Sequence, residues 1–485
     1  MYPAHQIDFY KSGHIYQYPE NTECVFSNFT ARKSRMPEVK GVVFFGLQYF
    51  VMEYLQTQWN EYFFHRPKAE VLSAYKHRMD NALGVGVVTT NHIAALHDLG
   101  YLPVEIRALP EGSVVPIGVP MLTLHNTGEF FWLTNYLETI MSCILWGPCT
   151  SATIAHEYKK ILNHYADYTV GDRSFVTHQA HDFSFRGMYG LEAAMMSGAA
   201  HLLSFIGTDT VPAIDFLERY YGAGYNGGVV GSSVPATEHS VMSMGGQEDE
   251  IRTFRRLIVD TYPAGVVSIV SDTWDFWKVI TEYLPALKYE IMSRDGKVVI
   301  RPDSGDPVKI ICGDPDAPAG TPEHKGAVEC VWELFGGTTT AMGYKLLDQH
   351  IGLIYGDGIT LERCRDICIK LKRKEFASTN MVFGVGSYSY QYNTRDTFGF
   401  AVKATYGEVG GVGREIFKKP KTDDGTKNSA KGLLAVYGAN GAYTLKSQAN
   451  WDQVYNDSMY TVFSNGQLIR RVAFNSICSR LTMSE

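Results

Sequence analysis

The middle of the chain repeats one pattern that limits its fold more than any other feature. A short β-branched segment is followed by a loop rich in Gly and Asp and then by an amphipathic helical stretch. The segments with their loops lie at 202–210, 266–272, 297–305, 351–358 and 380–387. Strands that alternate with helices in this way indicate a parallel α/β sheet. Because the loops after parallel strands gather at one end of a barrel, we expect these loops to form one site.

This pattern predicts a parallel α/β barrel over residues 171–395. An open, doubly wound sheet is the alternative, because helices on the outside do not prove that the sheet closes. Residues 1–170 mix extended segments with helices, and antiparallel strands are expected over 396–485. The expected helices of the barrel lie near 274–292, 326–335 and 361–376. The alternating runs near the C-terminus lie at 400–406 and 460–463.

Composition excludes some classes of protein. The chain has 485 residues and a net charge of −7, so neither a nucleic acid nor a membrane surface is an expected partner. The first residues lack the apolar run of a signal peptide, and the most apolar stretch, 131–146, contains Asn135 and Glu138. No CxxC pair is present, and Cys364 and Cys368 are expected to pack in the core. These features predict a cytoplasmic protein with reduced thiols.

Three Gly- and Asp-containing loops carry possible ligand groups. Arg301-Pro302-Asp303-Ser304-Gly305 and Gly356-Asp357-Gly358 could each be a simple turn if taken alone. Gly384-Val385-Gly386-Ser387 could cradle a phosphate with its backbone N–H groups, although it lacks the Lys and Ser/Thr ending of a P-loop. All three follow predicted strands. At one mouth, carboxylates can bind hydroxyl groups and backbone N–H groups can bind phosphate. This combination suits a sugar phosphate.

Two further motifs carry aromatic, cationic and imidazole groups. In 181–187, Phe183 could stack on a flat ring and Arg186 could bind a diphosphate, or they could be a core Phe beside a surface Arg. His239, in 233–240, could act as general base, metal ligand or phosphate acceptor. It could equally be a hydrogen-bonded loop histidine. The residues alone leave these alternatives open.

Together these motifs resemble those of the nicotinamide phosphoribosyltransferase family, in the same order and at close to the same spacing. The resemblance begins at Asp8-Phe9-Tyr10-Lys11 and continues through Thr394-Arg395-Asp396 and Lys403 to Phe417-Lys418. It implies a type II phosphoribosyltransferase with an irregular α/β barrel over 171–395 and a second, mixed α+β domain built from both chain ends. It also implies a homodimer with shared active sites. The implied reaction transfers phosphoribosyl from phosphoribosyl pyrophosphate to nicotinamide. It gives nicotinamide mononucleotide and diphosphate in NAD salvage, with Mg²⁺ and coupled ATP hydrolysis.

The resemblance also implies a role for each site residue. Phe183 and the partner subunit's Tyr10 would cover the two faces of the pyridine ring, and Asp209 would accept a hydrogen bond from the carboxamide. His239 would be phosphorylated by ATP, and Asp272 would lie beyond the water ligands of the diphosphate-bound Mg²⁺. The implied contacts to phosphoribosyl pyrophosphate are Arg186 and Arg301 at the diphosphate and ring, Asp303, Gly356 and Asp357 at the ribose hydroxyls, Gly386 and Ser387 at the 5′-phosphate, and Arg32, Arg395, Lys403 and Lys427 as cations, partly from the partner subunit.

Two departures from the family pattern concern phosphate binding. Ser387 and Tyr388 stand where the family has a run of glycines, and Ala401 stands where it often has a serine. Nicotinate phosphoribosyltransferase is the alternative activity, but Asp209 would repel a carboxylate substrate, whereas a carboxamide donates to it. A secreted or binding-only protein of the same fold is the rival from another class. The expected charged residues are present, which favours an enzyme.

Overall fold

The computed structural model describes residues 1–224, 228–418 and 430–484, which form two compact units. Unit 1 consists of Met1–Thr153, Phe216–Asn226 and Asn393–Glu485, and unit 2 consists of Ile154–Asp215 and Gly227–Tyr392. The predicted boundaries were 170 and 395. The structure instead divides the chain inside helix α6 (Glu138–Thr169) and again inside helix α8 (Val211–Tyr221). Long helices can carry residues of both units, which a change of sequence pattern does not reveal.

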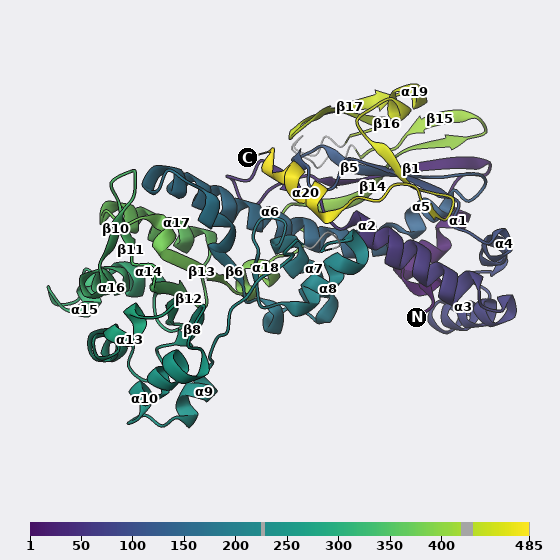
Figure 1. The fold of residues 1–485 in the computed structure, drawn as a ribbon. Coiled ribbons are helices and arrows are strands. Elements are labelled where there is room, and N and C mark those ends of the chain that lie inside the picture. Colours follow the sequence, from purple (N-terminus) through teal and green to yellow (C-terminus); the bar gives the residue numbers. More distant parts are fainter. Residues whose placement is uncertain (225–227, 419–429, 485) are drawn as a thin grey trace. The chain divides into compact units, whose positions relative to one another are not determined.

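Unit 2 is built around a parallel sheet of six strands (Figure 1). Each pair of neighbours along the order β7-β6-β13-β12-β9-β8 is parallel. The strands are rich in Val and Ile, and most of their side chains are buried, as expected for a sheet covered on both faces. Their bounds are β6 (Ala180–Asp182), β7 (Gly207–Thr208), β8 (Val267–Val270), β9 (Val298–Arg301), β12 (Ile351–Tyr355) and β13 (Met381–Val385).

One extended segment, 232–237, joins the two edges of this sheet. Ser232 forms a parallel bridge with Gly207 of β7, and Ala236 forms one with Ser268 of β8. The N–H of Thr208 donates to the Ser232 carbonyl at 3.0 Å, and the N–H of Ser268 donates to the Pro235 carbonyl at 2.9 Å. Because both edges pair with the same segment, the sheet curls on itself. The predicted irregular α/β barrel is confirmed, and the open sheet is not what forms.

Helices surround the barrel, as Figure 1 shows for α14, α16 and α17. Helix α17 is capped by Thr360, whose hydroxyl accepts from the N–H of Arg363, and buries Cys364 and Cys368 on one face. Neither thiol is in a disulfide, so both are packing residues as expected. The main helices of unit 2 are α7 (Leu191–His201), α9 (His239–Met244), α10 (Glu250–Arg255), α14 (Pro307–Cys312), α16 (Ala327–Phe335), α17 (Leu361–Arg373) and α18 (Ser387–Gln391).

One local prediction for unit 2 was wrong. Residues 202–206 are not a strand: the N–H groups of 202–205 continue to bond to the carbonyls of α7, including Phe205 N–H to His201 O at 3.1 Å, and the N–H of Ile206 bonds to the Thr177 carbonyl. Only Gly207–Thr208 joins the sheet. The helical stretch expected over 274–292 forms from Phe276 onward and includes a π-helical turn. It consists of α11 (Phe276–Lys278), η8 (Val279–Tyr283), α12 (Leu284–Ala286) and α13 (Lys288–Met292).

Unit 1 contains an antiparallel sheet of seven strands in the order β15-β14-β1-β5-β3-β18-β19. Strand β1 pairs with β14, so that Ala31 lies opposite Phe400 and residues from both ends of the chain share one sheet, as predicted. The strand bounds are β1 (Thr22–Ala31), β3 (Val104–Ala108), β5 (Pro120–Asn126), β14 (Phe400–Val409), β15 (Val412–Glu415), β18 (Tyr460–Ser464) and β19 (Gln467–Leu468). The main helices are α3 (Lys68–Leu83), α4 (Asn91–Leu99), α5 (Trp132–Tyr136) and α20 (Phe474–Thr482).

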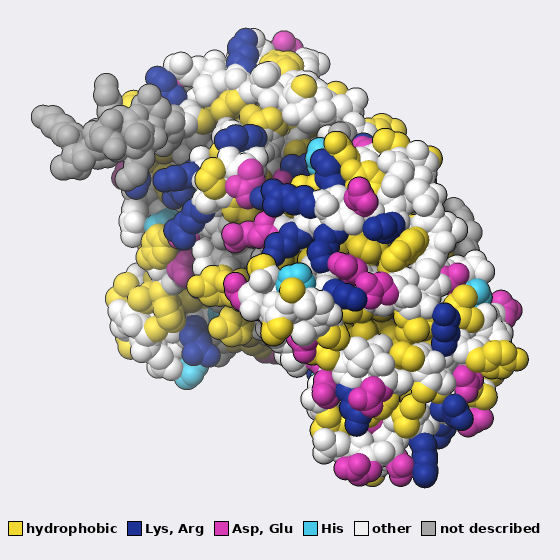
Figure 2. Space-filling view, turned by 90° about the vertical axis from the view of Figure 1, so that its left-hand side faces the viewer, with side chains coloured by type: hydrophobic (Ala, Val, Ile, Leu, Met, Phe, Trp, Pro, Cys, Tyr) yellow, Lys and Arg dark blue, Asp and Glu magenta, His cyan; other side chains and the backbone are white. Residues whose placement is uncertain are grey.

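The surface charge and the helices can be compared with the expectation that neither a nucleic acid nor a membrane is a partner. On the face drawn in Figure 2, Lys and Arg side chains stand in small groups among Asp, Glu and hydrophobic side chains. Across the described ranges, none of the helices has the length and apolarity needed to cross a bilayer. Positive charge is therefore local on this face, which suits a small anionic ligand better than an extended polyanion.

Candidate active site

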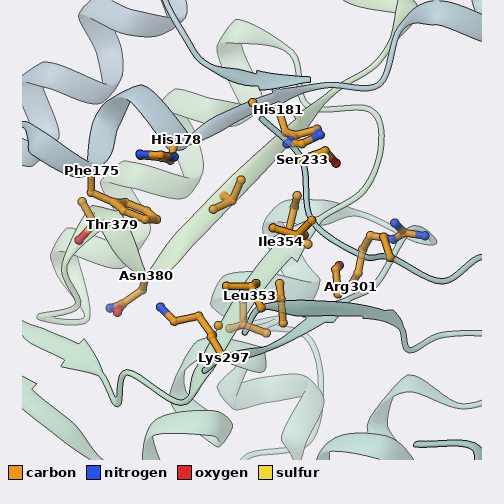
Figure 3. Close-up of a pocket in the computed structure, with 18 of the residues that line it drawn as sticks. Phe175, His178, His181, Ser233, Lys297, Arg301, Leu353, Ile354, Thr379 and Asn380 are labelled. Carbon is orange, nitrogen blue, oxygen red and sulfur yellow. The ribbon is translucent and has the colours of Figure 1, made fainter. Parts of the chain in front are cut away.

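A cavity of about 360 Å³ lies inside the barrel of unit 2 (Figure 3). Its walls are apolar side chains from the strands, such as Val299 and Leu353. Phe183, Asp209 and Arg301 line it near the carboxyl ends of the strands, while Lys297 and Asn380 line it near the amino ends. The structure thus brings together three predicted site residues that lie far apart in the sequence. An apolar slot with a few polar groups at one end suits a flat heteroaromatic ring.

Asp209 presents an ionised carboxylate to this cavity. Its Oδ1 lies 2.8 Å from His181 Nε2 and accepts a hydrogen bond from the Ser233 hydroxyl at 2.6 Å. Burial alone would raise the pKa of Asp209, but these hydrogen bonds outweigh it, and the pKa is lowered. Since both described donors use Oδ1, Oδ2 remains available to accept from a ligand. Figure 3 shows His181 and Ser233 close together at this end of the cavity.

The buried carboxylate of Asp182 holds the two loops that carry Phe183 and Asp209. Its Oδ1 accepts from the N–H of Ser184 at 2.9 Å, and its Oδ2 accepts from the hydroxyl of Thr210 at 2.7 Å. The N–H of Asp209 donates to the Asp182 carbonyl at 3.0 Å. One charged group therefore orients both the ring-stacking residue and the polar acceptor.

A second group of carboxylates follows β8 and β9. Oδ2 of Asp272 accepts from the N–H groups of Asp303 at 2.8 Å and Ser304 at 2.7 Å. Oδ1 of Asp272 and Oδ1 of Asp303 are buried and have no hydrogen-bond donor among the described residues. Burial raises the pKa of Asp303, although Arg301 opposes this. Two buried carboxylate oxygens without hydrogen-bond donors can be satisfied by donors or a cation from a ligand.

His239 begins helix α9 beside these carboxylates. Its Nε2 lies 3.8 Å from Asp272 Oδ1 and 3.9 Å from Asp303 Oδ2, and its Nδ1 lies 3.1 Å from the Thr273 hydroxyl oxygen. The side chain is 48% exposed. A half-exposed imidazole next to two carboxylates can both react with a ligand and pass on its proton.

The two arginines predicted here differ in position. Arg301 is mostly buried, and its Nη2 donates to the Thr237 carbonyl at 2.5 Å, which fixes the guanidinium at the cavity. Arg186 lies in the exposed turn η6 (Phe185–Gly187) and does not line the cavity. A Cβ atom on Gly187 would lie 2.0 Å from Ser387 Oγ, so the turn that carries Arg186 packs against the phosphate cradle.

Glycine is required at two of the ligand loops. A Cβ atom on Gly356 would lie 1.7 Å from Asp303 Oδ1, and one on Gly386 would lie 2.6 Å from Asp357 Oδ1. The predicted ribose and phosphate loops are therefore in direct contact through these glycines. Ser387, which replaces a family glycine, begins helix α18 and has no positive φ, so its side chain costs no backbone strain.

Unit 1 has a separate pocket of about 250 Å³, lined by Tyr10, Arg32, Arg395 and Lys403. All four were predicted as site residues, and the pairing of β1 with β14 brings the three cations together. Burial lowers the pKa of Lys403, and the neighbouring Glu138 opposes this shift. Ala401, the other departure from the family pattern, also lines this pocket. Lys427 lies outside the described residues.

Some functional residues were missed at the level of sequence. His181, Asp182 and Ser233 lie within quoted motifs but were given no role. Alternation along β6 places His181 and Phe183 on one face and Asp182 on the other, and this signal could have been used. No pattern in the sequence indicated that Lys297 would line the cavity.

Magnesium was expected through the diphosphate rather than in a protein cage. In the part of the chain that the structure describes, no group of three or more His, Cys, Asp and Glu side chains is arranged to hold a metal ion. The two unsatisfied oxygens of Asp272 and Asp303 nevertheless suit a hydrated Mg²⁺ that a substrate brings with it.

A parallel barrel whose mouth carries an apolar cavity, a group of carboxylates and glycine-containing loops is the architecture expected of a phosphoribosyltransferase of the barrel type. Comparison with known proteins is more specific. Residues 178–467 match the model of the nicotinate phosphoribosyltransferase family, and residues 4–106 match the nicotinamide phosphoribosyltransferase N-terminal domain. The chain belongs to the nicotinamide phosphoribosyltransferase family.

Its relatives cover nearly the whole chain. A nicotinamide phosphoribosyltransferase of Acinetobacter baylyi is 56% identical over 99% of this chain and 97% of its own length. One from Mycoplasma pneumoniae is 34% identical over 89% of this chain and 96% of its own length. Among solved structures, nicotinate-nucleotide pyrophosphorylase from Pyrococcus furiosus has a TM-score of 0.60 at 14% identity and covers 99% of this chain and 94% of that one. Human nicotinic acid phosphoribosyltransferase has a TM-score of 0.57 at 15% identity, covering 98% and 93%. These two likenesses show the fold.

Proposed function

We propose that this chain transfers the phosphoribosyl group of phosphoribosyl pyrophosphate to nicotinamide, giving nicotinamide mononucleotide and diphosphate for NAD salvage. The environment of Asp209 carries this proposal. Its carboxylate is ionised, and the described donors to it both use Oδ1. The NH2 group of nicotinamide can donate to Oδ2, whereas the carboxylate of nicotinate would be repelled there.

The proposed reaction needs no general base. The pyridine nitrogen attacks the anomeric carbon, the new C–N bond forms, and the C–O bond to diphosphate breaks with its electron pair leaving on oxygen. Phe183 would hold the ring in line for attack. Asp303 and Asp357 would hold the ribose hydroxyls and stabilise positive charge on the sugar, and Arg301 would lie by the diphosphate and the ring. Catalysis would then rest on position and electrostatics.

Magnesium would assist the departure of diphosphate. When bound, Mg²⁺ supplies positive charge to the leaving group. The unsatisfied oxygens of Asp272 and Asp303 would face its water ligands. This role is consistent with two Oδ1 atoms that have no hydrogen-bond donor among the described residues.

We propose that His239 couples ATP hydrolysis to this reaction. The γ-phosphoryl group of ATP would pass to an imidazole nitrogen: the P–O bond to ADP breaks with its electron pair leaving on ADP, the P–N bond forms, and the imidazole proton passes to a neighbouring carboxylate. The carboxylates of Asp272 and Asp303 lie 3.8 Å and 3.9 Å from Nε2 and support this role. In His239→Ala, mass spectrometry should find no ATP-dependent phosphorylation, and ATP should no longer stimulate a slow basal synthesis. Phosphorylation at another residue would contradict the assignment.

We propose that two copies of the chain share each active site. The unit 2 cavity supplies one stacking aromatic, Phe183, and the unit 1 pocket supplies Tyr10 with three cations. The partner subunit's Tyr10 would cover the second face of the ring, and its cations would meet the phosphates. We further propose that the enzyme acts in the cytoplasm, where thiols stay reduced.

The direct test is to measure diphosphate release with nicotinamide and with nicotinate, each with and without ATP. Nicotinamide should be the better substrate by kcat/KM. A preference for nicotinate would support the alternative activity, nicotinate phosphoribosyltransferase. Activity with neither would favour a binding-only protein.

A further inference from the structure

A buried hydrogen-bonded chain in unit 2 is not used by the proposed reaction. His201, the last residue of α7, is fully buried, and its Nδ1 lies 2.6 Å from the hydroxyl of Tyr390. Its Nε2 lies 3.1 Å from the carbonyl oxygen of Gly207. The chain therefore runs from Tyr390 on helix α18 through His201 to strand β7.

The proton positions in this chain follow from its chemistry. The Gly207 carbonyl can only accept, so Nε2 of His201 must carry the proton. Burial lowers the pKa of His201, which keeps the imidazole neutral and leaves Nδ1 as an acceptor. Burial raises the pKa of Tyr390, so its hydroxyl stays protonated and donates to Nδ1. Every polar atom of the His201 ring is thus satisfied in one arrangement.

Both ends of the chain lie next to predicted ligand groups. Gly207 is two residues before Asp209, and Tyr390 is three residues after Ser387 on the same short helix, α18. Ser389 lies between Ser387 and Tyr390 on α18 and makes a second hydrogen-bonded connection. It lies 2.8 Å from the Tyr158 hydroxyl, which donates to the carbonyl of Ile359 beyond the Gly356-Asp357 loop. Helix α18 is therefore tied to the nicotinamide loop and the ribose loop by separate hydrogen bonds.

We propose that His201 and Tyr390 are positioning residues that couple the phosphate cradle at Gly386 and Ser387 to the loop of Asp209. Binding of the sugar phosphate at α18 would then hold the Asp209 carboxylate in place for the carboxamide. This inference rests on the proposed function for the identity of the two ligands. The hydrogen-bonded chain itself does not depend on that identity.

The test is Tyr390→Phe, which removes one hydroxyl and keeps the ring. The matched control is Tyr443→Phe in unit 1, where a buried tyrosine hydroxyl lies 3.0 Å from the Ser113 hydroxyl and lines neither pocket. Hydrogen exchange of the amides at 208–210 is the first readout. In the wild type these amides bond to Ser232, Asp182 and Thr208. We expect about fivefold faster exchange there in Tyr390→Phe and no change in Tyr443→Phe, since one hydrogen bond contributes about 1 kcal/mol.

Kinetics supply the second readout. Tyr390→Phe should raise the KM for nicotinamide about fivefold with little change in kcat. This effect is expected although Tyr390 lies on α18, the helix that begins at the proposed phosphate cradle. In an Asp209→Ala background the same substitution should have no further effect on this KM, because it acts through Asp209. A merely structural role would lower Tm as in Tyr443→Phe and leave these quantities unchanged.

The outcomes separate this inference from the proposed function. Unchanged exchange at 208–210 in Tyr390→Phe, or an additive effect with Asp209→Ala, overturns the coupling even if the enzyme is active on nicotinamide. Lack of wild-type activity on nicotinamide overturns the proposed function, whereas the exchange measurement still decides the coupling. Should Tyr390→Phe not fold, His201→Gln replaces it; it keeps one donor and one acceptor and should speed exchange at the same amides by a smaller factor.

Discussion

Unit 2 and unit 1 build their pockets in opposite ways. In unit 2, the ligand groups follow strands of one parallel sheet, so each lies where its strand ends, and the cavity between them is lined mainly by apolar side chains. In unit 1, Arg32 follows the end of β1, while Arg395 and Lys403 flank the start of β14. The cations there come from opposite ends of the chain and meet only because these two strands pair. A local rule creates the first site, and a long-range pairing creates the second.

This difference suggests a division of labour. Carboxylates that surround the reacting carbon should act mainly in the transition state and affect kcat. Cations that hold phosphates bind the ground state as well and should affect KM. The substitutions below test this division, from the largest expected effect to the smallest.

Asp303→Asn should have the largest effect. It keeps the size of the side chain but removes a negative charge beside the ribose, so kcat should fall by about 10²–10³-fold. Steady-state kinetics with saturating substrates measure it, and Asp316→Asn is the control, because Asp316 is an 84% exposed aspartate. A change in KM alone would show that the unit 2 carboxylate only binds substrate.

Lys403→Ala should act mainly on substrate binding. A charge-assisted hydrogen bond contributes about 1.5–3 kcal/mol, so the KM for phosphoribosyl pyrophosphate should rise about 10–150-fold while kcat changes little. Lys403→Arg should keep most of the affinity, because the charge remains. An equal loss of kcat would place this unit 1 cation in the transition state and break the proposed division.

Asp209→Asn should change selectivity within unit 2. It removes the charge that repels nicotinate and adds an amide donor. The ratio of kcat/KM for nicotinamide to that for nicotinate should therefore fall by about tenfold, within the 1–3 kcal/mol cost of a mismatched polar group. The ratio measured with both substrates is the readout. If it keeps its wild-type value, another residue discriminates between the two.

Tyr10→Ala and Phe183→Ala test whether the two units belong to one site. Each should weaken nicotinamide binding by at least about fivefold, because ring stacking contributes about 1 kcal/mol beyond the buried area. When the two variants exchange subunits, one site of each heterodimer carries both changes and the other carries none. Activity per heterodimer should then approach half the wild-type value.

A pull-down with tagged subunits confirms that the exchange occurs. Heterodimers without recovered activity would mean that Tyr10 serves its own chain. The shared-site proposal would then be wrong, and the unit 1 pocket would need another ligand.

The smallest effect concerns pH. Burial raises the pKa of Asp303, whereas hydrogen bonds overcome burial and lower that of Asp209. As pH falls, Asp303 should therefore take up a proton first, so kcat should decline at a pH where the KM for nicotinamide is still constant. Kinetics between about pH 7 and the lowest pH that the fold tolerates measure this. A KM that rises before kcat falls would reverse the order of these carboxylates.

Much of unit 2 was predictable. The segments at 298–301, 351–355 and 381–385 form strands, because a parallel sheet covered on both faces buries their apolar side chains. The loops after these strands lie at the same end of the barrel, as expected. The strand expected over 202–206 does not form, because this apolar run follows a helix directly and continues its hydrogen bonds. No periodicity in the run distinguishes this case from a strand.

Several parts of the site were not predictable from local pattern. His181 and Ser233 share one oxygen of Asp209, and this contact depends on β6 and the segment 232–237 pairing with the two sides of β7. Likewise, no motif links His201 to Tyr390, which lie 189 residues apart.

The sequence by itself determined the alternation of strands and helices, the polar loops after the strands and the family to which the chain belongs, because these depend on residue type and short-range order. Only the tertiary structure decided that the barrel closes through 232–237, that Asp209 keeps one oxygen available and that the cations of unit 1 share a pocket. Those features depend on hydrogen bonds and packing between residues far apart in the chain. Such contacts stabilise the fold only after the backbone has brought the residues together, at a cost in loop-closure entropy.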